Sequence, residues 1–100
     1  MIKKTFYIWL FDKESKKQEF TTLEAYKIVQ KLTINHFWGG TIYQANGIYK
    51  HDDWAIVVEP SLVVDTVTME DHTKFINEVK SALNQESVMY QESHPTISFL

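Results

Sequence analysis

The chain has 100 residues, enough for one domain with a single hydrophobic core. Ten basic and thirteen acidic residues give a formal net charge of -3, which disfavours a general nucleic-acid binder because phosphate contacts need a basic face. The absence of cysteine excludes disulfides, thiolate metal sites and cysteine nucleophiles.

The N-terminus predicts no targeting segment. Its four residues MIKK lead into the short apolar stretch 5–11, which lacks the long apolar region and the cleavage site of a signal peptide. No apolar run reaches the roughly 18 residues that a membrane span needs. Together with the absence of cysteine, this predicts a cytoplasmic location and one domain over residues 1–100.

Residues 5–11 predict a strand with two apolar faces. Alternation places Phe6, Ile8 and Leu10 on one face, and Tyr7, Trp9 and Phe11 on the other. A strand that is apolar on both faces is normally central in its sheet. A charged turn over residues 12–17 follows, and it contains Lys13, Lys16 and Lys17.

The first helix is predicted to begin after Thr21, which forms an S/T-x-x-E capping box with Glu24. Apolar residues then recur at helical spacing, at Ala25, Ile28, Val29 and Leu32. We expect the helix to end near residues 33–35. The segment HFWGG (36–40) then reads as a loop that exposes Phe37 and Trp38.

Residues 41–51 and 54–68 predict a long hairpin that closes at Asp52–Asp53. The pair Asn46–Gly47 is itself a strong hairpin signal, so it is either the turn or a bulge. Closure at Asp52–Asp53 brings Gly47 near Val58 and Pro60. We favour the bulge, because a glycine bulge facing a strand interrupted by proline accounts for both residues.

A second helix is predicted after Thr68, Glu70 and Asp71, whose polar side chains suit a helix N-terminus. Its apolar stripe consists of His72, Phe75, Ile76, Val79, Ala82 and Leu83. Residues 87–92 predict a last strand, and residues 96–100 an apolar tail.

The element order predicts an α+β, ferredoxin-like βαββαβ sandwich, with a four-stranded antiparallel sheet and two helices on one face. The first and third strands are then central. The open face of the sheet carries one apolar side of the first strand, so we expect a homodimer to form through it. The alternative is that residues 97–100 fold back and cover this face.

No metal-binding or cofactor-binding residue is predicted. His51, Asp52 and Asp53 are adjacent on a tight turn and rarely point at one ion. RNA binding through Trp9 or Tyr7 on the open face is disfavoured, because the third strand lacks the expected basic and aromatic residues.

No catalytic residue is predicted either. Glu59 and Asp65 lie inside an otherwise apolar strand, and either could act as a base if it pointed inward and its pKa rose. We favour an outward or edge position for both.

The segments TIYQANGIYK, AIVVEPSLVV and SALNQESV resemble those of small uncharacterised proteins carried by phages, plasmids and conjugative elements of low-GC Gram-positive bacteria. Many short acidic proteins of such elements bind and block host defence nucleases, including CRISPR effectors. The resemblance therefore implies an antagonist role, with a host nuclease as partner.

The leading hypothesis is a non-enzymatic interaction protein, such as an anti-CRISPR inhibitor, that acts by protein–protein contact. Tyr7, Trp9 and Phe11 are the residues expected in self-association. The residues expected to contact a partner are Phe37, Trp38, Trp54, Lys13, Lys16 and Lys17. The alternative is a small dimeric enzyme of the cofactor-independent oxygenase type. It would use a cavity between helices and sheet, lined by His36, His72 or Asp65.

Overall fold

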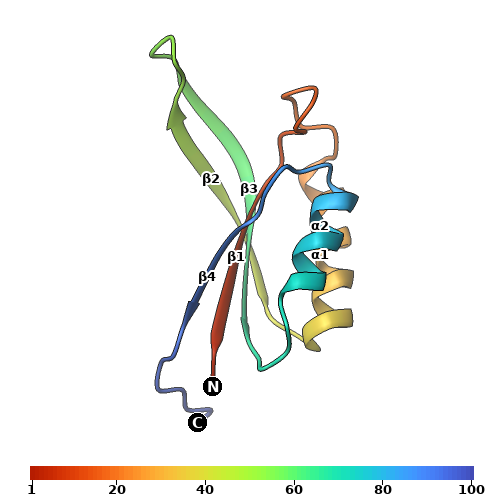
Figure 1. The fold of residues 1–100 in the computed structure, drawn as a ribbon, viewed down its shortest axis with the longest axis vertical. Coiled ribbons are helices and arrows are strands. Elements are labelled where there is room, and N and C mark those ends of the chain that lie inside the picture. The colour runs from red at the N-terminus through yellow and green to blue at the C-terminus, as the bar shows by residue number, and fades with distance from the viewer.

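A computed structural model describes residues 1–100 and has the predicted βαββαβ order. The elements are β1 (Lys3–Trp9), α1 (Thr22–Phe37), β2 (Thr41–Lys50), β3 (Ile56–Val67), α2 (Thr73–Ala82) and β4 (Met89–Ser93). The four strands form one antiparallel sheet in the order β2-β3-β1-β4, so β1 and β3 are central as predicted. Both helices cover the same face of this sheet, which confirms the ferredoxin-like sandwich (Figure 1).

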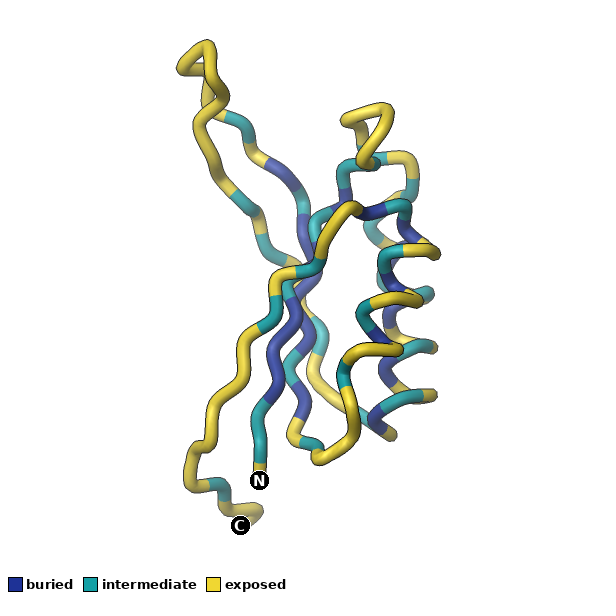
Figure 2. Tube along the Cα trace, viewed as in Figure 1, coloured by how far each residue is buried: buried dark blue, intermediate teal, exposed yellow.

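The core lies between the sheet and the helices. Phe6 and Ile8 on β1 pair in register with Val64 and Leu62 on β3, and all four are fully buried. Facing them are the buried residues Ala25 and Val29 of α1, and Phe75 and Val79 of α2. Figure 2 shows burial concentrated along β1 and β3. Of the two apolar faces of residues 5–11, the one with Phe6 and Ile8 therefore packs against the helices. The one with Tyr7 and Trp9 lies on the open face of the sheet.

Helix α1 begins as predicted and ends later than predicted. The Thr21 hydroxyl accepts a hydrogen bond from the Glu24 amide at 3.1 Å, and the Glu24 carboxylate accepts one from the Thr21 amide at 3.4 Å. The expected end near residues 33–35 is wrong, because the helix continues to Phe37. Trp38 ends it in a left-handed conformation, with φ of 71°.

The prediction that Phe37 is exposed is also wrong. Its side chain is 6% exposed, and its ring packs against Phe6 and Phe75. Burial of an aromatic ring stabilises the last helical turn by more than the helix propensity of residues 33–37 costs. The helix end predicted from local sequence signals is therefore too early.

The β2–β3 hairpin closes at Asp52–Asp53 as predicted, since the His51 amide donates to the Ala55 carbonyl at 2.8 Å. Pairing is unbroken from Thr41 with Asp65 to Lys50 with Ile56, so Asn46–Gly47 is neither a turn nor a bulge. The favoured bulge is wrong. Gly47 does lie next to Val58 and Pro60, directly opposite Glu59.

Beyond the helices, the hairpin projects as an arm over residues 48–58 (Figure 1). Ile48, Ile56 and Val58 are more than half exposed there, because the helix layer does not extend far enough to cover them. Trp54 in the turn takes a φ of 70°, the left-handed region where glycine is usual.

The C-terminal tail, residues 94–100, leaves the sheet next to the N-terminus (Figure 1). Phe99 is 83% exposed, and only Ile97 is partly buried. The alternative in which residues 97–100 cover the open face is therefore wrong. None of the helices has the length and apolar character that crossing a bilayer requires.

Candidate functional site

A pocket of about 390 Å³ lies at one end of the open sheet face. Trp9 and Phe11 line it from β1 and the segment after it, and the hairpin contributes Tyr49, His51, Val57 and Glu59. The remaining walls come from two loops, residues 12–16 and residues 85–87. The volume falls within the range of about 300–1,000 Å³ typical of small-molecule sites. We call it the Glu59 pocket.

Glu59 is the one buried carboxylate of the chain, with 7% of its surface exposed. One carboxylate oxygen accepts a hydrogen bond from the Phe11 backbone amide at 2.9 Å. Burial raises the pKa of the Glu59 carboxyl above its ordinary value, and the Phe11 hydrogen bond offsets part of this rise. No cationic side chain forms a salt bridge with it. Glu59 points to the open face, away from the helices, as predicted, but its side chain is buried there.

Asp12 fixes the loop that forms the rim of the pocket. It accepts hydrogen bonds from the backbone amides of Glu14 and Ser15 at 2.9 and 3.1 Å, and from the Asn84 side-chain amide at 2.7 Å. The Asn84 hydrogen bond is the main reason why the pKa of the Asp12 carboxyl lies below its ordinary value. The two loops are therefore joined across the pocket.

Two further hydrogen bonds connect the same two loops. The side-chain amide of Gln85 donates to the Phe11 carbonyl at 2.8 Å, and the Lys13 amide donates to the Asn84 carbonyl at 3.0 Å. Gln85 is buried by this arrangement, whereas its neighbour Glu86 is exposed at the rim. The walls of the pocket are thus set before any ligand binds.

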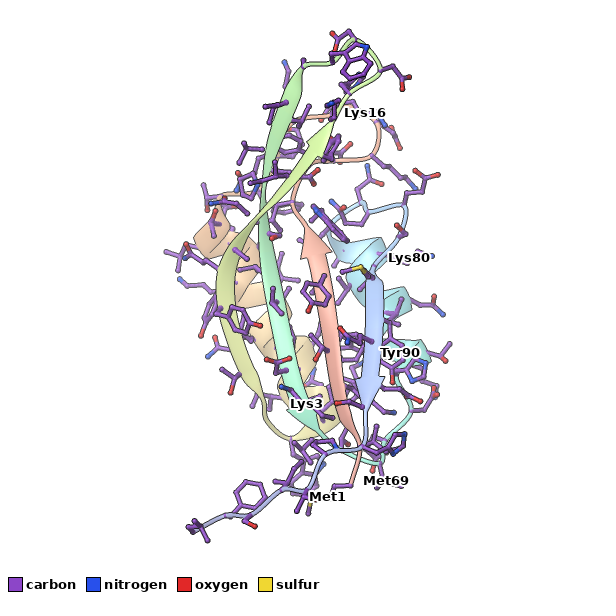
Figure 3. The ribbon with its side chains drawn as sticks, turned by 90° about the vertical axis from the view of Figure 1, so that its left-hand side faces the viewer. Met1, Lys3, Lys16, Met69, Lys80 and Tyr90 are labelled. Atoms are coloured by element: carbon purple, nitrogen blue, oxygen red, sulfur yellow. The ribbon has the colours of Figure 1, made fainter.

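Cations lie at the rim and the carboxylate lies inside. Lys13 and Lys16 both line the pocket and are exposed, and Lys16 donates to the Lys13 carbonyl at 2.6 Å. Figure 3 labels Lys16 on the loop between β1 and α1, and Lys16 lines the pocket together with Tyr49 of the hairpin. A ligand in this pocket would meet aromatic walls, one desolvated carboxylate and an ammonium-rich rim.

The structure divides the predicted interaction residues into separate groups. Trp9, Phe11, Lys13 and Lys16 come together in the Glu59 pocket. Lys17 is exposed on the adjoining loop, and Tyr7 is half-buried on the open face. Trp38 and Trp54 are 90% and 75% exposed and lie at opposite ends of the molecule, and Phe37 is in the core.

Sequence reasoning had not placed Tyr49, Gln85 and Glu86 in any site. They carry no local motif, and only the pairing of β2 with β3 and the path of the loop after α2 bring them to Glu59. Glu59 itself stands out in the sequence, because it lies inside an apolar strand.

The oxygenase-type alternative needs His36, His72 or Asp65 in a cavity between the helices and the sheet, and the structure places these residues at three separate positions. His36 lies 2.8 Å from Glu78 across the two helices, and the His72 ring stacks on Tyr90 with centroids 4.0 Å apart. Asp65 accepts a hydrogen bond from the Thr5 hydroxyl at 2.6 Å and lines a different pocket, of about 850 Å³, beside the C-terminal tail. The buried core fills the space between the helices and the sheet.

No cluster of three or more histidine or carboxylate side chains is placed to hold a metal ion.

Comparison with known proteins gives a fold but no family. No family profile and no curated protein matches the chain. A phage SAM lyase in complex with S-methyl-5'-thioadenosine is similar in structure, with a TM-score of 0.66 and 13% identity over 92% of this chain and 79% of that one. The phage SAM lyase in its apo state gives a TM-score of 0.64 and 16% identity, over 92% and 78%. At these identities the likeness establishes the fold alone.

Proposed function

We propose that this chain is a phage-encoded, defence-related enzyme that binds S-adenosylmethionine (SAM) in the Glu59 pocket and cleaves it as a lyase. The observation that carries the proposal is Glu59 itself, a buried carboxylate without a cationic partner in a preformed pocket. A structural neighbour that acts on SAM supports the same ligand.

The chemistry of SAM matches the lining of the pocket. Its sulfonium and ammonium groups are cations that suit Glu59 and the rim carboxylate of Glu86. Its carboxylate suits Lys13 or Lys16, and its adenine ring suits walls made of Phe11 or Tyr49. A neutral apolar ligand would leave Glu59 buried without a cationic partner.

A lyase reaction on SAM can be balanced without a cofactor. The bond between the sulfonium sulfur and the γ-carbon of the aminobutyrate arm breaks, and its electron pair returns to sulfur, which leaves neutral S-methyl-5'-thioadenosine. The carboxylate of the same arm attacks the γ-carbon and closes a lactone. No water, metal ion or redox partner enters this step.

This step neutralises charge, because a sulfonium and a carboxylate disappear together. A desolvated pocket favours such a change, since it stabilises separated charges less than water does. The pocket therefore needs to position the two ends of the substrate rather than donate or remove a proton. In this proposal Glu59 is a binding residue for the cationic part of SAM, and Lys13 orients its carboxylate.

The proposal also gives a physical basis for the antagonist role implied by the sequence resemblance. SAM is the methyl donor of methyltransferases, so its destruction would disable a host system that depends on it. No contact with a host nuclease is needed for that effect.

The anti-CRISPR-type interaction protein stays a second candidate, favoured by one observation. The arm exposes Ile48, Ile56 and Trp54 by more than two thirds of their surface, and exposed apolar side chains of this kind can anchor a protein partner. Capture of a nuclease by the wild-type chain, lost on replacing Ile56 with Lys, would favour this candidate over the lyase.

The lyase is tested by incubating the purified chain with SAM and separating the products by chromatography. We expect S-methyl-5'-thioadenosine to form, and Glu59→Gln to lower kcat/KM by at least about tenfold because the cation loses its charged partner. Glu78→Gln is the matched control, since that carboxylate pairs with His36 on the helices. SAM left intact by the wild-type chain would overturn the proposal.

A further inference from the structure

Trp9 lies across the open face of the sheet and reaches a strand that does not pair with its own. A Cβ atom built on Gly47 would overlap the indole nitrogen of Trp9 and lie 3.0 Å from its Cδ1 atom. Trp9 is on β1 and Gly47 on β2, and β3 runs between them. The indole therefore spans the width of β3.

Small residues make this placement possible. The register partner of Trp9 on β3 is Ser61, whose own partner on β2 is Ala45. Gly47 has an ordinary strand conformation rather than a positive φ, so its backbone does not require glycine. The space taken by the Trp9 indole is what requires glycine at this position.

The same geometry places the indole beside Glu59. Gly47 and Glu59 are register partners, so the nitrogen atom that occupies the side-chain space of residue 47 lies next to the Glu59 side chain on the same face. Both Trp9 and Glu59 line the pocket. An aromatic ring and a carboxylate therefore adjoin the same space.

We propose that Trp9, held in place by the absence of a side chain at Gly47, is a specificity-determining residue that makes the pocket select a sulfonium nucleoside over the neutral thioether of the same shape. A cation between an aromatic face and a carboxylate is stabilised by both groups, whereas a neutral sulfur gains from neither. This inference rests on the proposed function, because it concerns the ligand of the Glu59 pocket.

The matched ligands are SAM and S-adenosylhomocysteine, which differ by the methyl group that makes the sulfur cationic. For the wild-type chain, the KM for SAM cleavage should be roughly tenfold lower than the inhibition constant of S-adenosylhomocysteine. In Trp9→Leu this ratio should fall toward one, and in Trp9→Phe part of it should return because a smaller aromatic ring remains. Trp54→Leu, at the exposed end of the arm, is the control and should keep the wild-type ratio.

Gly47→Ala tests the positioning without changing Trp9. The added methyl group displaces the indole, so the SAM preference should fall as it does in Trp9→Leu. If Gly47→Ala does not fold, the two Trp9 variants still decide the question.

The two hypotheses fail differently. A wild-type chain that cleaves SAM while Trp9→Leu retains the full preference for SAM would overturn the role of Trp9 and leave the lyase standing. A wild-type chain that binds neither nucleoside would overturn both.

Discussion

The rings of Phe6 and Phe37 stack with their centroids 5.6 Å apart and their planes at 19°. This contact joins the central strand β1 to the last turn of α1. It explains why the helix continues past the β-branched residues near Thr33, where the sequence predicts its end. Trp38, rather than Asn35, therefore caps the helix.

The first prediction concerns this contact. Phe37→Ala should lower the free energy of unfolding by about 3–5 kcal/mol, because it removes a buried ring and leaves a cavity between Phe6 and Phe75. Urea unfolding followed by circular dichroism measures the change. Trp38→Ala is the control, since Trp38 is 90% exposed and should change stability little. Equal effects of the two substitutions would contradict the burial of Phe37.

The second prediction concerns the N-terminus of the same helix. Thr21→Ala removes the hydroxyl that accepts from the Glu24 amide and should cost about 1 kcal/mol of stability. Lys27→Ala, on the exposed side of α1, should cost much less. A Thr21→Ala variant as stable as Lys27→Ala would show that the capping box contributes nothing to stability.

The third prediction concerns the pH dependence of stability. The pKa of the Glu59 carboxyl is raised in the folded chain, so the folded state holds its proton more tightly than the unfolded state does. The free energy of unfolding should therefore fall as pH rises from the unfolded pKa through the folded one. Glu59→Gln should remove this fall, because its amide cannot ionise, and should be more stable than the wild type at about pH 8.

Urea unfolding of both chains at about pH 5 and pH 8 measures this difference. A wild-type chain that gains stability over this interval, relative to Glu59→Gln, would show that Glu59 is not desolvated. A Glu59→Gln variant that is more stable but less active would show that Glu59 promotes ligand binding and lowers the stability of the fold.

The fourth prediction concerns ligand binding at the same carboxylate. A cation bound beside Glu59 stabilises its ionised form and lowers its pKa, so binding releases a proton. The affinity for SAM should therefore rise as pH increases through the pKa of the free site and then level off. The KM for SAM cleavage measured across this pH range checks the prediction, and loss of its pH dependence in Glu59→Gln assigns the proton to this residue.

The fifth prediction concerns self-association. The sequence predicts a homodimer through the open sheet face, which carries the half-exposed side chains of Tyr43 and Met89. If that face is buried in a dimer, Met89→Asp should shift light scattering toward the monomer, because a buried unpaired charge is costly. Met69→Asp, in the loop before α2, is the control. A wild-type chain that is monomeric at all concentrations tested would remove the dimer.

The sequence alone determined the layers of this protein. Three local patterns predict these layers: the alternation of residues 5–11, the capping box at Thr21 and the helical stripe around Phe75 and Val79. An element that buries one face repeats apolar residues at the spacing of its secondary structure, so the sequence alone shows the element. The central position of β1 followed from its two apolar faces.

Tertiary structure alone decided the end of α1, the role of Gly47 and the site. Phe37 is helical because Phe6 and Phe75 bury its ring. Residue 47 has to be glycine because the Trp9 indole, from a strand two positions away in the sheet, fills the space of its side chain. Glu59 became a site residue only when the hairpin and the loops at Asp12 and Gln85 enclosed it. These features depend on contacts between segments far apart in the chain, and no periodic pattern in the sequence indicates such contacts.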